Sequence, residues 1–178
     1  MNQVLFRLSA FFLYLISLLP FWLLYILSDI LYIFLYYLLG YRRKVVKSNL
    51  ANSFPELSVK ARAVIEKRFY KYLADMILES VKSRSITPSE LKKRYEIENI
   101  ELISSHLSAG RSVIAALGHY GNWEWGPIAI GCLLKEKVLV VYKPLSDNRF
   151  DNFINSIRSR FGAVMVPMKQ TLRKIIEY

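Results

Sequence analysis

The sequence predicts an α/β fold, in which a mainly parallel sheet with flanking helices follows an N-terminal membrane helix or helical hairpin. Two observations support this prediction. Strand and helix patterns alternate over residues 112–177, and such alternation implies right-handed crossovers and a parallel sheet. The first forty residues carry only Arg7 and Asp29 as charges and hold eleven of the 25 aromatic residues (3 Trp, 12 Tyr and 10 Phe), which is the composition of a membrane segment.

The apolar N-terminus is too long for one straight membrane helix. Residues 8–28 already supply the length of about 20 residues that a span needs, and residues 30–39 continue the apolar stretch. Pro20 offers a break, and Asp29 is a second weak point. We therefore expect either a kinked spanning helix with an interfacial extension or a shallow re-entrant hairpin. A cleaved secretory signal fits less well, because no small-residue cleavage site is clear.

The net charge of +11 resides entirely beyond residue 40, because Arg7 and Asp29 cancel. Four cations follow the apolar segment directly: Arg42, Arg43, Lys44 and Lys47. This flank is expected in the cytoplasm and close to anionic lipid headgroups. The pattern divides the chain into a membrane anchor (residues 1–41), a basic juxtamembrane connector (residues 42–58) and a domain that follows (residues 59–178).

Residues 49–58 are rich in turn formers, and Pro55 followed by Ser58 is typical of the entry to a helix. A helix is predicted over residues 59–82. Its expected apolar face consists of Ile65, Phe69, Tyr72, Leu73, Met76 and Ile77. Residues 94–97 alternate like a short edge strand, and residues 100–107 are predicted to be helical with Gly110 as the C-cap.

The alternating region begins at residues 112–117, an apolar run typical of a strand buried on both faces. A turn over residues 118–122 and a helix over residues 123–134 follow. The remaining predicted elements are a strand (137–142), a helix (148–160), a third strand (163–166) and a final helix (170–177).

The turn after the first of these strands carries the residues suited to chemistry, because open α/β sheets bind ligands at the carboxyl ends of their strands. His119 can take a proton near neutral pH, and Glu124 could orient the ring through its other nitrogen. Asn122 is a candidate helix N-cap, which would place a helix N-terminus beside the base. A histidine in a turn is also commonly just a solvent-exposed residue.

No nucleophile or metal set accompanies this pair. Cys132 lies in an apolar run and is expected to be a core residue, and no GxSxG occurs. The chain has two histidines, His106 and His119, and no zinc-binding spacing, so no metal or other cofactor is expected. The base would therefore activate a hydroxyl of the substrate.

Residues 118–126 read GHYGNWEWG and resemble the His-x4-acid signature of glycerolipid-type acyltransferases, the lysophospholipid-acyltransferase-like superfamily. The longer form, with His119, Gly121, Asn122, Trp123 and Glu124, is similar to the lipid A late acyltransferase family, the lauroyl and myristoyl transferases. The resemblance continues in residues 41–56 (YRRKVVKSNLANSFPE) and in a second block of Tyr142, Lys143, Pro144, Leu145, Asp151, Arg158, Phe161 and Gly162.

The resemblance implies a membrane-bound O-acyltransferase at the bacterial inner membrane, with its catalytic domain facing the cytoplasm. Such an enzyme moves a fatty acyl chain from acyl carrier protein onto a hydroxyl of a phosphorylated glycolipid, a lipid A precursor. It uses neither a metal nor a covalent intermediate.

The resemblance also implies roles for individual residues. His119 would be the general base and Glu124 its partner, while Arg158 would lie near a substrate phosphate or the oxyanion. Gly121, Asn122, Trp123 and Lys143 would contribute to substrate binding, with Lys143 standing where the family often has Arg. Family members continue for roughly a hundred residues further, so the acyltransferase domain is expected to be incomplete at its C-terminus.

Two alternatives stay open within this reading: an acyltransferase for another acceptor, such as a lysophospholipid or an aminolipid, and a truncated inactive fragment. A nucleic-acid-binding module, which the pI of 9.8 suggests, is disfavoured because the aromatic residues concentrate in the anchor and the basic residues are dispersed.

Overall fold

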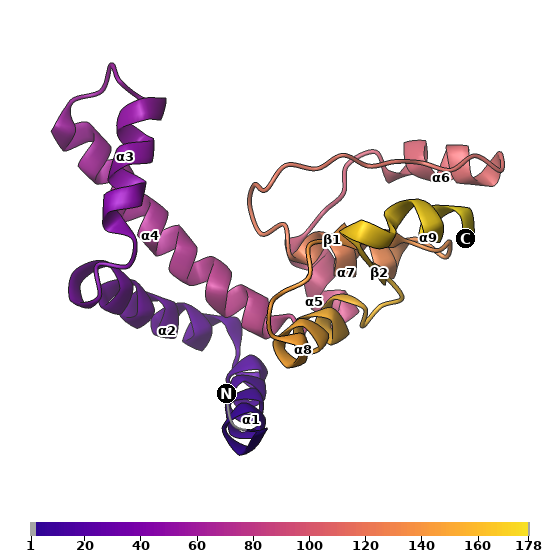
Figure 1. Cartoon of the computed structure of the whole chain (residues 1–178), viewed down its shortest axis with the longest axis horizontal. Coiled ribbons are helices and arrows are strands. Elements are labelled where there is room, and N and C mark those ends of the chain that lie inside the picture. Colours follow the sequence, from indigo (N-terminus) through magenta and orange to yellow (C-terminus); the bar gives the residue numbers. More distant parts are fainter. Residues whose placement is uncertain (1–2, 178) are drawn as a thin grey trace. The chain divides into compact units, whose positions relative to one another are not determined.

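The computed structural model describes residues 3–177, and these are mostly helical with one small parallel sheet of two strands. The chain separates into two compact units, Met1–Lys82 and Ser83–Tyr178. Figure 1 shows the helices of the first unit in indigo and magenta and the elements of the second in pink to yellow.

The first unit consists of α1 (Gln3–Leu18), α2 (Phe21–Ile33), the π-helical segment η1 (Phe34–Leu38), α3 (Arg43–Ser53) and α4 (Val59–Lys82). The backbone of Pro20 is extended, with φ −65° and ψ 154°, so the break predicted there is confirmed. The helix runs on through Asp29 without interruption. The segment Phe21–Leu38 is long and apolar enough to cross a membrane, judged by length and composition.

The bounds predicted for α4 are confirmed, but the prediction of its buried face is wrong. The buried residues of α4 are Glu66, Tyr70, Ala74, Leu78 and Lys82. In contrast, Phe69, Tyr72 and Ile77 of the expected apolar face are exposed. Hydrophobic periodicity misses this face because hydroxyl groups of α2, a carbonyl of α1 and Arg43 of α3 pair with polar side chains of α4.

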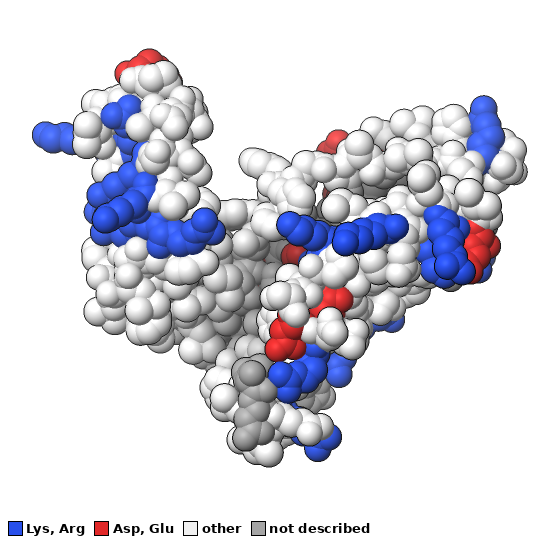
Figure 2. Space-filling model, in the orientation of Figure 1, with Lys and Arg blue, Asp and Glu red and all other residues white. Residues whose placement is uncertain are grey.

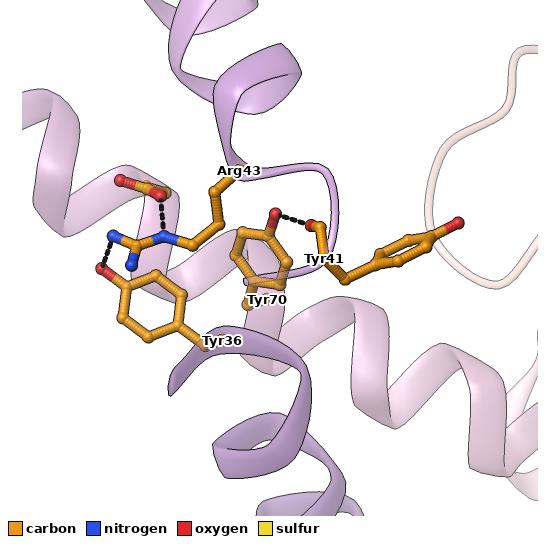
Figure 3. Close-up of polar contacts among 5 residues, drawn as sticks. Tyr36, Tyr41, Arg43 and Tyr70 are labelled. Atoms are coloured by element: carbon orange, nitrogen blue, oxygen red, sulfur yellow. Dashed lines mark hydrogen bonds and ion pairs between the residues drawn. The ribbon is translucent and has the colours of Figure 1, made fainter. Parts of the chain in front are cut away.

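Polar contacts join α4 to the start of α3 and to Tyr41, and they also link α3 to η1 (Figure 3). Arg43 Nε donates to Glu66 Oε1 at 2.8 Å, and Arg43 Nη2 donates to the Tyr36 hydroxyl at 3.0 Å. The Tyr70 hydroxyl donates to the backbone carbonyl of Tyr41. The guanidinium also lies over the Tyr36 ring, 4.1 Å from its centroid, so that both Glu66 and Tyr36 hold Arg43.

The connector is more regular than its turn-rich composition suggests. Helix α3 continues to Ser53, so the turn predicted to begin at residue 49 is wrong, and the irregular linker starts only at Phe54. The predicted entry to α4 is confirmed, because Ser58 Oγ accepts a hydrogen bond from the Ala61 amide at 3.2 Å.

The second unit contains α5 (Pro88–Arg94), α6 (Ile100–Ser108), α7 (Trp125–Leu133), β1 (Leu139–Tyr142), α8 (Asn148–Arg158), β2 (Val164–Pro167), the short 3₁₀ helix η2 (Met168–Gln170) and α9 (Thr171–Glu177). Strands β1 and β2 are parallel, with Leu139 opposite Val164, and α8 is the crossover between them. Two of the predicted strands and the helix between them are therefore confirmed as one βαβ unit.

Two other predicted strands are wrong, so the fold is mostly helical rather than a wide α/β sheet. Residues 94–97 contain no strand, since α5 ends at Arg94. Residues 112–117 are irregular, and the side chains of Ile114 and Leu117 are 92% and 77% exposed. A strand buried on both faces needs a neighbouring strand for its backbone hydrogen bonds and helices that cover both faces. Among the described residues, no strand pairs with this segment.

Helix α5 was not predicted, although the sequence contains a start signal for it. Residues 83–93 appear merely polar, yet Pro88 is the first residue of α5 and Thr87 is its N-cap, whose hydroxyl accepts from the Glu90 amide at 3.2 Å. A Thr followed by Pro and, two residues later, by Glu is a recognisable helix start.

Helix α7 packs against the βαβ unit through small and apolar residues. Ile128 and Ala129 of α7 are buried, as are Ile157 of α8 and Val166 of β2. At Gly131 a Cβ atom would lie 2.6 Å from the carbonyl oxygen of Phe161, so only glycine permits this approach. This packing brings the beginning of α7 and the end of α8 together.

Candidate functional site

The segment with the predicted catalytic residues leads directly into α7. Gly121 has φ +59°, in the left-handed region that favours glycine. Two turns follow, in which the amides of Trp125 and Gly126 donate to the carbonyls of Asn122 (3.1 Å) and Trp123 (3.0 Å). Helix α7 therefore begins at Trp125, two residues later than predicted, and Glu124 occupies the N-cap position that the sequence assigned to Asn122.

Glu124 and Arg158 form a two-pronged ion pair. Arg158 Nε donates to Glu124 Oε2 at 2.8 Å, and Arg158 Nη2 donates to Glu124 Oε1 at 2.5 Å. The side chains are 26% and 22% exposed, so the pair is partly withdrawn from water. Both helix dipoles favour this arrangement, since the carboxylate is at the N-terminus of α7 and the guanidinium at the C-terminus of α8.

His119 is exposed and contacts an aromatic ring rather than a carboxylate. Its imidazole lies edge-to-face with Trp123, with ring centroids 5.0 Å apart and an interplanar angle of 73°. Within the described part of the chain, His119 and Glu124 share no hydrogen bond, and both carboxylate oxygens of Glu124 accept from Arg158. The imidazole is thus accessible, and the residue predicted to orient it is held by the arginine.

Lys143 lies in an exposed segment that a buried carboxylate holds in place. Asp151 Oδ1 accepts from the Leu145 amide at 2.8 Å. Asp151 Oδ2 accepts from the Tyr142 hydroxyl and from Asn155 Nδ2, each at 3.0 Å. These bonds fix the chain on both sides of Lys143. Burial raises the pKa of Tyr142, and its hydrogen bond to Asp151 raises it further.

The structure thus joins the predicted site residues in two pairs, Glu124 with Arg158 and His119 with Trp123. Lys143 is exposed and forms no ion pair within residues 3–177. Gly121 and Asn122 lie between His119 and Trp123 in the sequence and are half-buried.

Three site features escaped sequence reasoning. The ion pair of Glu124 with Arg158 has no local signal, since 34 residues separate the partners. The anchoring role of Asp151 was also missed, although Asp151 and Asn155 have the i, i+4 spacing of a helical side-chain pair. Tyr142 belongs to the same network and appeared only as part of the second resemblance block.

The remaining candidates lie outside these pairs. Cys132 is half-buried on α7, and burial raises the pKa of its thiol, which makes it a poor nucleophile. His106 is exposed in the last turn of α6. No group of three or more His, Cys, Asp or Glu side chains is positioned to hold a metal ion in the residues that the structure describes.

A family model described as bacterial lipid A biosynthesis acyltransferase matches residues 1–178 of the chain. No curated protein matches the chain with significant similarity.

Proposed function

Because the chain belongs to the bacterial lipid A biosynthesis acyltransferase family, we propose that it moves a fatty acyl chain from acyl carrier protein onto a hydroxyl of a lipid A precursor. The observation that carries this proposal is the family match over residues 1–178, which includes the His119–Glu124 segment. The reaction takes place at the cytoplasmic side of the bacterial inner membrane. Residues 1–41 anchor the protein, residues 42–58 connect it to the membrane surface, and residues 59–178 belong to the acyltransferase domain.

The reaction is a direct transfer in which His119 is the general base. Its imidazole takes the proton of the acceptor hydroxyl while the hydroxyl oxygen attacks the thioester carbonyl carbon. The new C–O bond forms, the C–S bond breaks, and the proton passes from the imidazolium to the leaving thiolate of the carrier protein. The exposure of His119 supports this role, because a bulky lipid hydroxyl must reach the ring.

Once the Glu124 carboxylate is released from Arg158, it stabilises the imidazolium of His119. The carboxylate and the imidazole belong to one short segment, so a side-chain rotation after the ion pair opens is the motion required. A phosphate group of the acceptor is the natural competitor for the guanidinium, since Arg binds carboxylate and phosphate through the same fork. Substrate binding at Arg158 would thereby free the partner of the base.

The other predicted residues bind and polarise the substrates. The backbone N–H groups of Gly121 and Asn122 stabilise the oxyanion, and the Trp123 ring supports the imidazole at 5.0 Å. Lys143, held by the Asp151 network, meets the phosphorylated glycolipid or the acidic carrier protein. The net charge of +11 suits both acidic partners.

The test is acyl transfer by the purified chain in detergent, from a series of acyl carrier protein thioesters to a lipid A precursor, with product mass as the readout. His119→Ala should lower the rate of transfer by about 10²–10⁴-fold, which is the usual contribution of a general base. The matched control is His106→Ala, which removes the other histidine of the chain from an exposed position on α6 and should leave transfer unchanged.

Parallel reactions with a lysophospholipid and with an aminolipid separate the acceptor classes. Acylation of either one in preference to the lipid A precursor contradicts the proposed acceptor but keeps the reaction type. No transfer to any of the three acceptors contradicts the proposed activity of this chain.

A further inference from the structure

The outward surface of α1, α2 and η1 is apolar. On α2 and η1 the exposed side chains recur at helical spacing and form one face, which we call the apolar face: Trp22, Ile26, Ile30, Ile33 and Tyr37. On α1 the exposed side chains include Val4, Leu8, Phe11 and Leu15. So many exposed apolar side chains on neighbouring helices are unusual for a protein in water and mark a contact with lipid or protein.

The opposite side of α2 and η1 faces α4 and combines buried apolar side chains, such as Phe21 and Leu24, with polar groups that are bound to α4. From one end to the other, the Tyr25 hydroxyl donates to Glu79 (2.9 Å) and the Ser28 hydroxyl to Asp75 (2.5 Å). Further along, Lys71 pairs with Asp29 at 3.2 Å and Tyr70 packs on Tyr36, with ring centroids 5.3 Å apart. We call this row of contacts the polar seam.

Both ends of α2 are also tied to α4. At the start, the buried Lys82 donates to the carbonyls of Ser17 (3.0 Å) and Leu19 (2.9 Å), which precede the break at Pro20. Beyond the far end, Arg43 pairs with the buried Glu66 (Figure 3). Helix α4 therefore accompanies α2 and η1 from the α1 junction to the beginning of α3.

The contacts between α2 and α4 restrict how α2 can bind a membrane. If Phe21–Leu38 crossed the bilayer, α4 would cross beside it. Helix α4 has nine charged residues, among them Lys60, Lys67 and Arg68, which lie exposed. Charged side chains at hydrocarbon depth are strongly unfavourable, and separation of the helices would leave the polar seam without partners in lipid. The two ends of α2 thus belong on the same side of the membrane.

Charge indicates the kind of surface that the apolar face meets. Arg42, Lys44 and Lys47 are exposed just beyond η1, and Figure 2 shows basic side chains gathered over α3 beside the white surface of α2. Cations at the end of an apolar face favour the headgroup region of an anionic leaflet.

From these contacts we propose that α2 and η1 do not cross the membrane but lie along one anionic leaflet. The apolar face enters the boundary between headgroups and acyl chains, and α4 covers the opposite side in water. The inference stands independently of the proposed acyl transfer, because it uses only contacts within residues 3–82.

Site-directed spin labelling measures this arrangement in the full chain. With Cys132 replaced by Ser, single cysteines at Trp22, Ile26, Ile30 and Tyr37 are labelled, and the protein is bound to vesicles of phosphatidylethanolamine and phosphatidylglycerol. Collision rates with oxygen and with a water-soluble nickel chelate then give the depth of each label. These side chains are exposed, so the substitutions change the outer surface of the helices.

A helix along one leaflet places all four labels at a similar shallow depth, about 5–10 Å below the headgroups. A spanning helix, in which Trp22 and Tyr37 are separated by about 22 Å, places Ile30 deepest and the two ends near opposite surfaces. That depth profile, or water exposure of all four labels, overturns the inference.

The matched control is a label at Arg68 on α4, which stays accessible to the chelate if α4 lies on the water side. Loss of chelate collisions at Arg68 together with the spanning profile would show that both helices enter the bilayer. Circular dichroism of each labelled variant checks that its helices remain. Acyl transfer is measured separately, so failure of the depth prediction leaves the proposed function untouched.

Discussion

Removal of the arginine from the Arg43–Glu66 ion pair is predicted to destabilise the N-terminal unit far more than removal of the glutamate. The two side chains are joined at 2.8 Å but differ in burial, since Arg43 is 32% exposed and Glu66 only 2%. Arg43→Met leaves a buried carboxylate without its cation, whereas Glu66→Gln leaves an arginine that can turn toward water.

The expected magnitudes follow from this asymmetry. Loss of one partner from a buried pair costs about 3–5 kcal/mol when the charge left behind stays buried. Glu66→Gln keeps an acceptor oxygen and leaves the half-buried cation, so it should cost about 1 kcal/mol. For a chain of this size, 1 kcal/mol shifts Tm by about 2–4 °C, which gives a loss of about 6–20 °C for Arg43→Met.

The assay is thermal unfolding in mild detergent, followed by circular dichroism. Lys71→Met is the matched control, because the Lys71–Asp29 pair of the same helices is 60% and 58% exposed and should contribute about 0–1 kcal/mol. The double variant Arg43→Met, Glu66→Met should recover much of the stability that Arg43→Met loses, since no buried charge remains. Equal and small losses for both single variants, or strict additivity in the double variant, would refute this account of the pair.

Three further predictions concern other polar contacts of the two units. Burial raises the pKa of Tyr70, so the stability that the protonated Tyr70 hydroxyl contributes is complete below the unfolded pKa of 10.0 and is lost as the pH rises through the folded pKa. Tyr70→Phe should therefore flatten the fall of Tm above about pH 10, whereas the control Tyr120→Phe should not. Asp151→Asn weakens a carboxylate that accepts three hydrogen bonds and should lower stability by about 1–3 kcal/mol, which is measurable by urea unfolding; an unchanged midpoint would contradict this role. Lys82→Met removes both donors to the carbonyls of Ser17 and Leu19 and should lower Tm by several degrees, whereas Lys60→Met at an exposed position should not.

Local sequence patterns predicted most of those elements of the second unit whose stabilising contacts come from residues nearby in the sequence. The strands predicted at residues 137–142 and 163–166 are present as β1 and β2, with α8 between them, because in a βαβ unit the two strands pair with each other and the helix covers them. The strand at residues 112–117 is absent among the described elements. Its apolar run has the propensity for a strand, but a strand forms only where another strand and covering helices accept it.

The sequence by itself determined the helix boundaries at Pro20 and Ser58 and the βαβ unit, because each depends on residues near one another in the chain. Tertiary structure alone decided two other features. The buried side of α4 is the one that carries Glu66, Tyr70 and Lys82 rather than the one predicted from periodicity, and Glu124 pairs with Arg158 rather than with His119. Both features are contacts between residues far apart in the chain. Buried polar groups pair with the partner that best satisfies their hydrogen bonds and charge, and local periodicity does not predict that partner.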